Sequence, residues 1–192
     1  TGVAGYIGSH MALKLLQNGF TIVGIDNLSR GSLNALQVLK KSPNFHFLKI
    51  DLGDVESVEH IFTNYRFTYV FHFAALAFVS ESVRFPDLYF KNITKNTQII
   101  VDTMLRHNVP RLIYSSTCAV YGAPEKLPIT EETPTKPVSP YGKYKLEAEK
   151  YIAENSIVKV YGSESAEQLI DHCFQIFGGY GFIEEYPMAQ AY

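Results

Sequence analysis

Tyr141 and Lys145 are the two residues of this sequence whose types and spacing most clearly suggest chemistry. They form a Tyr-x-x-x-Lys pattern within residues 141–155, a segment rich in Lys and Glu that is typical of a helix. Residues four apart share a helix face, so the ammonium group should lie beside the phenol. A neighbouring positive charge should lower the pKa of Tyr141 from about 10 toward neutrality. The pair predicts a general base, although Tyr and Lys at this spacing also occur as plain surface residues.

Ser115, Ser116 and Thr117 add a second feature to this pair. They stand at the end of a short apolar run, residues 111–115, which is typical of a buried strand. Hydroxyl groups in this place can hold a substrate oxygen near the phenol of Tyr141. The alternative interpretation is an ordinary turn, because Ser and Thr are frequent turn residues.

Three glycines open the chain in the run Thr-Gly-Val-Ala-Gly-Tyr-Ile-Gly, and a helical pattern at residues 9–17 follows. Glycines let the backbone turn tightly and approach a pyrophosphate, which binds at the helix N-terminus. Such a loop should follow a strand, and we expect that strand to be missing before Thr1. Asp26 strengthens the signal because the next strand ends there. A carboxylate in that position accepts the ribose hydroxyls of NAD and repels a 2′-phosphate, although Arg30 leaves some tolerance for NADP.

Two further strand ends carry residues of interest. Asp51 follows the second strand, where it can contact an adenine edge or cap the next helix, and Asp54 is the better cap candidate. Ala74 and Ala75 follow the third strand. Their small side chains would let a cofactor lie against the backbone, or would simply allow the strand end to pack closely.

The elements that must position these residues alternate along the chain. Short apolar runs predict strands at residues 20–25, 45–50, 69–73 and 111–115. Apolar residues at helical spacing predict helices at 9–17, 33–39, 55–65, 86–107 and 141–155, and the proline-rich stretch 123–140 predicts a loop. This order indicates an α/β fold with a parallel sheet, right-handed crossovers and helices on both faces.

Composition excludes several classes of function. The 192 residues carry 17 Lys and Arg against 19 Asp and Glu, a net charge of −2, which argues against nucleic-acid binding. The longest apolar run is too short to span a membrane. Two cysteines, Cys118 and Cys173, cannot build a disulfide framework or a zinc site, so no metal is expected and a reducing compartment is favoured.

Taken in order, these motifs resemble those of the extended short-chain dehydrogenases/reductases, and within them the UDP-sugar 4-epimerases. The resemblance covers residues 1 to about 155 through TGVAGYIGSH, DNLSRGS, DLGD, HFAALAFVSES, KNITKNT, SSTCAVYG and SPYGKYKLEAEK. DNLSRGS, DLGD and SSTCAVYG are especially similar to plant-type UDP-arabinose 4-epimerases. The resemblance implies a Rossmann-like doubly wound parallel sheet lacking its first strand, bound NAD, a UDP-sugar substrate and a homodimeric parent enzyme. It implies a cytoplasmic location, with the Golgi as the alternative for a plant-type parent.

The resemblance also implies a role for each site residue. Tyr141 removes the proton from the sugar 4-hydroxyl, NAD⁺ takes the hydride from C4, and the hydride returns to the other face of the 4-keto sugar. Lys145 tunes Tyr141 and holds the nicotinamide ribose, and Thr117 hydrogen-bonds the 4-oxygen. The implied cofactor contacts are Gly2, Gly5, Tyr6, Ile7, Gly8, Asp26, Asn27, Asp51, Leu52, Phe73, Ala74, Ala75, Asn92, Ser115, Tyr141 and Lys145, and the implied substrate contacts are Thr117 and Tyr141.

Cys118 and Ala119 separate the epimerases from neighbouring classes. Nucleotide-sugar 4,6-dehydratases carry an Asp-Glu pair just before the Val-Tyr-Gly, and UDP-glucuronate decarboxylases carry Glu at the second of these positions. The chain offers no carboxylate at either one, so the epimerase interpretation is favoured. Ala77 stands where the bacterial epimerases have Lys, which removes one cofactor contact.

Residues 156–192 leave the epimerase pattern and resemble the late helical region of an acyl-CoA dehydrogenase, through QxxGGxG at 175–181 and EYP at 185–187. We therefore expect a truncated NAD-binding domain at 1–155 and a foreign helical tail at 156–192. The chain is expected to be a fragment that is inactive alone. The alternatives are a non-catalytic dinucleotide-binding module or, from the tail only, a piece of an FAD-dependent acyl-CoA dehydrogenase.

Overall fold

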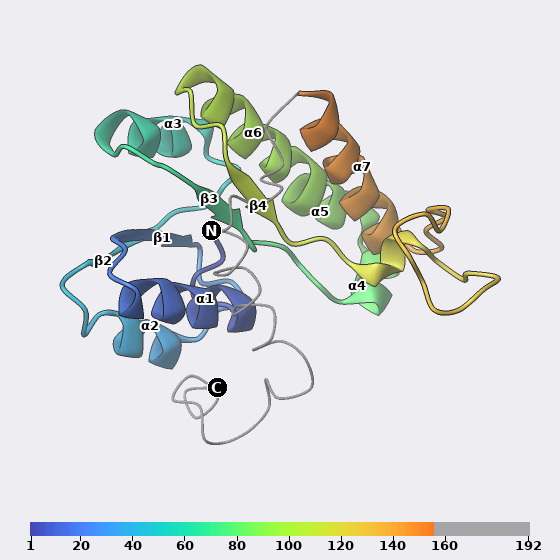
Figure 1. The fold of residues 1–192 in the computed structure, drawn as a ribbon, viewed down its shortest axis with the longest axis horizontal. Coiled ribbons are helices and arrows are strands. Elements are labelled where there is room, and N and C mark those ends of the chain that lie inside the picture. Colours follow the sequence, from blue (N-terminus) through green and yellow to red (C-terminus); the bar gives the residue numbers. More distant parts are fainter. Residues whose placement is uncertain (156–192) are drawn as a thin grey trace. The chain divides into compact units, whose positions relative to one another are not determined.

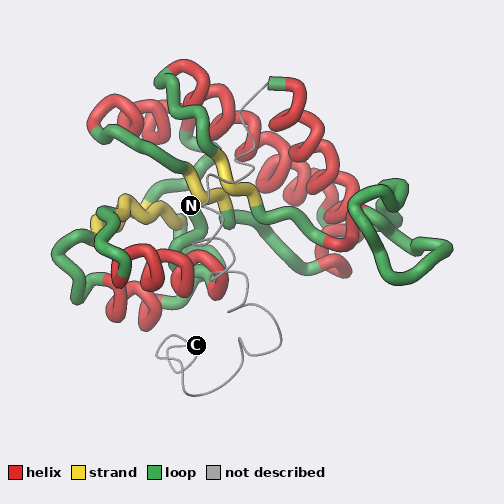
Figure 2. The backbone as a smooth tube through the Cα atoms, in the orientation of Figure 1, coloured by secondary structure: helices red, strands yellow, loops and turns green. Residues whose placement is uncertain are grey.

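A computed structural model describes residues 1–155 of the chain (Figure 1). Strands and helices alternate along it, and Figure 2 shows the long loop that precedes the last helix. The elements are α1 Tyr6–Gln17, β1 Ile22–Asp26, α2 Leu33–Leu39, β2 Phe45–Lys49, α3 Val55–Asn64, β3 Val70–His72, α4 Val79–Arg84, α5 Pro86–Tyr89, the π-helix η1 Phe90–Lys95, α6 Asn96–Arg106, β4 Leu112–Tyr114, the 3₁₀-helix η2 Cys118–Val120 and α7 Pro140–Glu154. The predicted α/β order is confirmed.

The described chain forms two compact units. The first comprises Thr1–Asp51 and Val70–Ala74, and the second comprises Leu52–Tyr69 and residues 75–155. The predicted domain boundary at residue 155 stays a prediction, and the predicted tail lies outside the described residues. Within the described part of the chain, no helix is long and apolar enough to cross a bilayer. No cluster of three or more metal-ligating side chains occurs there either.

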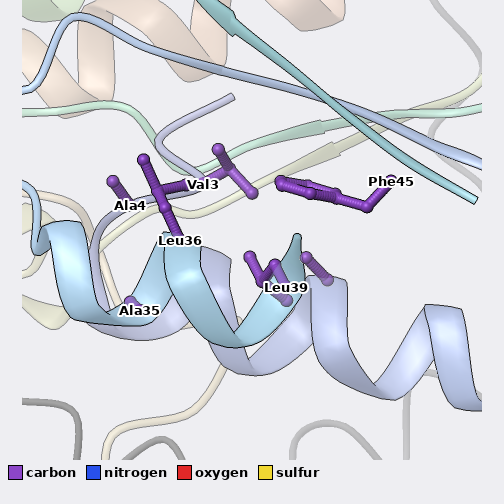
Figure 3. Packing of buried hydrophobic residues seen from close by; sticks show 7 residues of the cluster. Val3, Ala4, Ala35, Leu36, Leu39 and Phe45 are labelled. Carbon is purple, nitrogen blue, oxygen red and sulfur yellow. The ribbon is translucent and has the colours of Figure 1, made fainter. Parts of the chain in front are cut away.

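The core of the first unit joins the glycine loop to α1, α2 and β2 (Figure 3). β1 and β2 pair in parallel, with Gly24 opposite Phe47 and Asp26 opposite Lys49. The main buried cluster consists of small and branched side chains that let the elements approach closely: Val3, Ala4, Ala12, Ala35, Leu36, Leu39 and Phe45. Close packing here holds the glycine loop rigidly against the strand that ends at Asp26.

The second unit is mainly helical. The side chains of Ile100, Val101 and Met104 on α6 are completely buried. Another buried cluster contains Tyr89, Ile93, Tyr141 and Ala148, so α5, η1 and α7 share one core. Residues of α7 are also tied to α6 by a hydrogen bond of 2.6 Å from the Tyr151 hydroxyl to Asp102. The element that carries Tyr141 and Lys145 is therefore well supported within its own unit.

Side-chain caps explain where several helices begin. Asp54 caps α3 by accepting from the Ser57 amide at 3.1 Å, which confirms the cap predicted for it. Ser139 caps α7 by accepting from the Gly142 amide at 3.1 Å. α1 differs from the prediction, because it begins at Tyr6 rather than at residue 9, with Gly5 as its uncapped N-terminal residue.

The long helical segment predicted for residues 86–107 is confirmed from residue 86 to residue 106, but it is not one uniform α-helix. The structure divides it into α5, the π-helix η1 and α6. The apolar spacing alone does not show the wider turn, because a π-helix adds one residue per turn without changing residue type. The short helix α4 was not predicted, because Val79 and Val83 point outward with 46% and 62% exposure and give no buried stripe.

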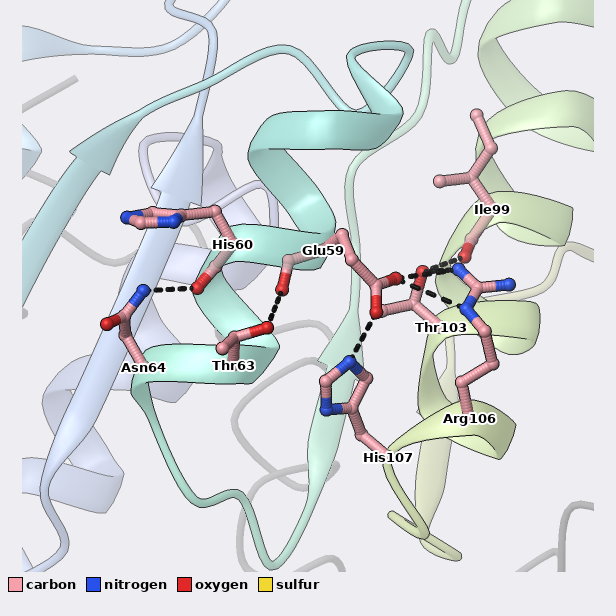
Figure 4. A network of polar contacts seen from close by, with 8 residues as sticks. All are labelled: Glu59, His60, Thr63, Asn64, Ile99, Thr103, Arg106 and His107. Carbon is pink, nitrogen blue, oxygen red and sulfur yellow. Dashed lines mark hydrogen bonds and ion pairs between the residues drawn. The ribbon is translucent and has the colours of Figure 1, made fainter.

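Glu59 on α3 links two helices of the second unit (Figure 4). Its Oε2 accepts from Nε of Arg106 at 3.2 Å and from Nη2 at 2.8 Å, and its Oε1 lies 2.5 Å from Nε2 of His107. The hydrogen bond from Arg106, followed by that from His107, lowers the pKa of Glu59 below its ordinary value of 4.5. A depressed carboxyl pKa stabilises the fold above the unfolded pKa, and this contribution is lost as the pH falls through the folded pKa.

Glu59→Gln should therefore lower stability at pH 7 by a small amount, because the network is exposed to solvent. The difference from the wild type should shrink as the pH falls below 4.5 and through the lower folded pKa, where the wild-type carboxyl becomes protonated. Urea unfolding at pH 7 and at about pH 3.5 measures both effects. Glu125→Gln, in the loop before α7, is the matched control. An equal loss at both pH values would show that the charge of Glu59 contributes nothing.

Candidate active site

The glycine loop packs directly against the end of β1. The amide of Gly2 donates to the carbonyl of Ile25 at 2.8 Å, and Gly2 has a φ of +70°. A Cβ on Gly2 would lie 2.6 Å from the amide nitrogen of Ala74, and a Cβ on Gly8 would overlap the carbonyl oxygen of Gly2. The loop therefore accepts only glycine at these two positions, and Ala74 lies against it as predicted for a small residue.

The N-terminus of α1 follows this loop without a side-chain cap at Gly5. The helix runs for 12 residues, and the first intrahelical bond links the amide of Ser9 to the carbonyl of Gly5 at 2.9 Å. Amides in the first turn of a helix point along its axis, and the helix dipole favours an anion there. Tyr6 and Ile7 belong to this turn, and Ile7 is 38% exposed. The geometry suits a pyrophosphate.

Asp26 is the last residue of β1, as predicted. Its Oδ2 accepts from the amide of Ala4 at 3.0 Å, and its Oδ1 accepts from the amide of Leu28 at 2.8 Å. These bonds orient the carboxylate beside the glycine loop. The neighbouring Asn27 donates from Nδ2 to Oδ2 of Asp51 at 2.8 Å, so two further predicted contacts lie together.

Tyr141 lies in the first turn of α7, in the second unit. Its side chain is buried, and its ring stands edge-on to Tyr89 with 6.4 Å between the centroids. The Thr117 hydroxyl lies near enough to the phenol to lower its pKa. Thr117 also accepts from the amide of Ala119 at 3.2 Å, which fixes its hydroxyl at the start of η2. The structure thus brings together the predicted base and the predicted substrate-oxygen partner.

The predicted lowering of the Tyr141 pKa is wrong in this structure. Burial raises the pKa of Tyr141 above 10, the hydrogen bond from Thr117 opposes this, and Cys118 adds to it. Lys145 does not contribute because its ammonium group is engaged elsewhere. Nζ donates to the carbonyl of Ser115 at 2.7 Å and lies 4.7 Å from the ring centroid of Tyr114.

Lys145 is itself almost fully buried, with 3% exposure. Burial lowers its pKa to about 8, and the carboxylate of Glu149, one helical turn further on, opposes that shift. Ser115 therefore enters the site through its carbonyl group. The hydroxyl of Ser116 is buried and has no hydrogen-bond partner among residues 1–155.

Asn92 lies in the π-helix η1, where its Oδ1 accepts from the amide of Leu76 at 2.7 Å. Single-turn π-helices occur frequently at functional sites. Ala75 and Leu76 pack against the cluster that contains Tyr141. Phe73 is half-buried and Leu52 is buried. Their contacts with a cofactor stay predictions. Ser82 and Tyr89 also touch Tyr141, and nothing in the sequence pattern marked them.

The fold and the glycine loop define a Rossmann-like α/β protein. The chain belongs to the family described as GDP-mannose 4,6 dehydratase, whose model matches residues 1–175. That match extends past residue 155, and the comparisons give no support to the predicted acyl-CoA dehydrogenase resemblance of the tail.

The chain is similar to UDP-sugar epimerases of known sequence and structure. It is 51% identical over 160 residues to UDP-arabinose 4-epimerase 1 of Arabidopsis thaliana, covering 81% of this chain and 38% of that protein. It is 42% identical over 175 residues to a UDP-glucose 4-epimerase of Cyamopsis tetragonoloba, covering 88% and 49%. The structure of the UDP-Glc/GlcNAc 4-epimerase from Campylobacter jejuni matches with a TM-score of 0.79 at 38% identity, over 81% of this chain and 47% of that one. The chain thus spans about two fifths to half of these relatives' length.

Proposed function

We propose that the polypeptide carrying this chain is an NAD-dependent UDP-sugar 4-epimerase. The observation that carries the proposal is the proximity of the Thr117 hydroxyl to the Tyr141 phenol, in the same unit that buries Lys145. A phenol near a second hydroxyl suits proton removal from an alcohol. A structure of a related epimerase from Stenotrophomonas maltophila holds NAD and formylated UDP-arabinopyranose, at 30% identity and a TM-score of 0.75.

The first unit fits NAD on its own geometry. Its helix N-terminus suits the pyrophosphate, the bare backbone at Gly2 and Gly8 permits close approach, and Asp26 supplies acceptors for ribose hydroxyls. NAD, when bound, supplies the hydride acceptor.

The residues of the second unit supply the remaining functions. Tyr141 takes the proton of the sugar 4-hydroxyl, and Thr117 holds that oxygen in line. Lys145, once an NAD ribose offers it hydroxyl acceptors, holds that ribose and adds positive charge near the phenol.

The family description names a dehydratase, and the residues of this chain argue for a different reaction. Elimination of water from a sugar needs an acid and a base besides the tyrosine. Cys118 and Ala119 occupy the two positions after Thr117, and neither carries a carboxyl group. Cys118 is exposed, and it lies close enough to Tyr141 to raise its pKa. We therefore place the chain with the epimerases of the family.

The substrate is a UDP-pentose or a UDP-hexose. The pair UDP-xylose and UDP-arabinose is favoured by the 51% identity to a UDP-arabinose 4-epimerase. To test this, the polypeptide as its source makes it is incubated with NAD and one sugar nucleotide at a time: UDP-xylose, UDP-glucose or GDP-mannose. The products are then separated by chromatography. Interconversion of a UDP-sugar with its 4-epimer supports the proposal. Formation of a 4-keto-6-deoxy sugar from GDP-mannose would overturn it.

Three finer expectations belong to the same proposal. The parent enzyme should be a homodimer, which size-exclusion chromatography with light scattering measures. Its location should be cytoplasmic, which fluorescence microscopy of a tagged protein tests, and the comparisons do not support the Golgi alternative. Nucleic acid and membranes are not expected as partners, given the near-neutral charge.

Asp26→Asn should weaken NAD binding by about tenfold, or ~1.4 kcal/mol, because the ribose hydroxyls lose charged acceptors. NADP binding should fall less or improve, because the charge that repels a 2′-phosphate is removed. Calorimetric titration with both cofactors measures the ratio. Asp87→Asn on α5 is the control and should leave both affinities unchanged. An unaltered ratio of NAD to NADP affinity in Asp26→Asn would show that this carboxylate does not contact the ribose.

A further inference from the structure

Ser82 is a completely buried hydroxyl residue of the short helix α4. Its Oγ donates to the carbonyl of Val79 at 2.6 Å and accepts from the backbone amide of Tyr141 at 3.1 Å. The Ser82 hydroxyl is therefore both a donor and an acceptor. It donates within its own helix and accepts from the first turn of α7. The second contact falls on the residue that carries the phenol of the site.

The beginning of α7 depends on such side-chain acceptors. The first amides of a helix have no acceptor within the helix. Pro140, the first residue of α7, has no amide hydrogen. The hydroxyl of Ser139 accepts from the amide of Gly142, and the hydroxyl of Ser82 accepts from the amide of Tyr141. The hydrogen bond on the amide of Tyr141 is buried, so the loss of its acceptor would be destabilising. Ser82 is the acceptor that comes from a different element.

The helix that carries Ser82 is held in turn by Tyr89. The Tyr89 hydroxyl accepts from the amide of Phe78 at 3.1 Å and donates to Glu81 at 2.8 Å. The same ring lies edge-on to Tyr141. Tyr89 has 0% exposure, so its ring is held in a close-packed region, and its two hydroxyl contacts are partly buried. α4 is thus a fixed support for the Ser82 hydroxyl.

We propose that Ser82 is a positioning residue that holds the first turn of α7, and with it the Tyr141 phenol, in its buried place near Thr117. The proposal rests on the function proposed above only in its effect on turnover. Without the Ser82 hydroxyl the Tyr141 amide must find water or shift, and the first turn loosens. The phenol then moves relative to Thr117, and water reaches a ring that the wild type buries.

The first test is a titration of the Tyr141 phenol by ¹³Cζ-tyrosine NMR in the full chain, with the signal assigned through Tyr141→Phe. Ser82→Ala should move the phenol pKa down from its raised value, because burial is the largest cause of that rise. Ser82→Thr retains the hydroxyl and should restore the wild-type value. Thr94→Val is the matched control, since Thr94 contacts α7 only one turn later, at the carbonyl of Tyr144 at 3.3 Å and at Glu147.

This titration needs neither cofactor nor sugar, so its outcome is independent of the proposed function. An unchanged phenol pKa in a folded Ser82→Ala variant, or an equal shift in Thr94→Val, would overturn the positioning role and leave the proposed function standing. In turnover, Ser82→Ala should lower kcat by about tenfold to a hundredfold with KM nearly unchanged, because a small displacement of a reacting group is costly. Absence of turnover in the wild type would overturn the proposed function alone.

Discussion

Tyr141→Phe is expected to reduce epimerisation of the UDP-sugar by about 10²–10⁴-fold while leaving NAD affinity within about twofold. The phenol hydroxyl is the group whose pKa the nearby Thr117 lowers, and the ring supplies the packing against Tyr89. Phenylalanine retains the ring and removes only the hydroxyl. The buried core around Ala148 and Ile93 should therefore remain intact, and the loss should be one of chemistry.

The measurement compares kcat, KM, NAD affinity and thermal stability for Tyr141→Phe and Tyr144→Phe on the polypeptide as its source makes it. Tyr144 lies on the same helix, and its ring stands edge-on to that of Phe90 with 5.4 Å between the centroids. Tyr144→Phe therefore makes the same chemical change on the same helix. Tyr144→Phe should retain nearly full activity. If Tyr141→Phe retained more than about a tenth of the rate, another group would have to be the base.

The residues that carry chemistry could be predicted because each belongs to a local pattern. The position of Asp26 at the end of an apolar strand and the helix cap formed by Asp54 are confirmed, while the contact of Asp26 with NAD stays a prediction. α2 spans the predicted residues, Leu33–Leu39, because its apolar spacing is regular and Ser32 caps it. Propensity, spacing and capping agree in these places, so the sequence alone specifies the local structure.

The parts that could not be predicted depend on contacts between distant segments. The amide of Leu76 donates a hydrogen bond to Asn92, which lies 16 residues further along the chain. The amide of Tyr141 donates to the hydroxyl of Ser82, 59 residues earlier. No periodicity encodes such pairings. The pKa of Tyr141 shows the same limit. The spacing to Lys145 suggested a direct effect of charge, but the carbonyl of Ser115 draws the ammonium group away, and burial dominates.

Gly8→Ala is expected to lower NAD affinity by more than about a hundredfold and to destabilise the chain. The added Cβ would overlap the carbonyl oxygen of Gly2 and lie 3.1 Å from Cα of Val3. Both neighbours are backbone atoms of the loop that turns toward the cofactor, so the loop itself must move. Gly19→Ala is the control: it has a φ of +84°, and no atom lies within 4 Å of its added Cβ.

The control separates a loss of stability from a loss of binding. Gly19→Ala should cost about 1 kcal/mol through its left-handed backbone conformation and should leave NAD affinity unchanged. Gly8→Ala should lose more NAD affinity than a smaller folded fraction of the protein can explain. Calorimetric titration below the melting temperature of the variant measures this loss. Wild-type NAD affinity in a folded Gly8→Ala variant would mean that the pyrophosphate does not approach this loop, and the cofactor site would have to lie elsewhere.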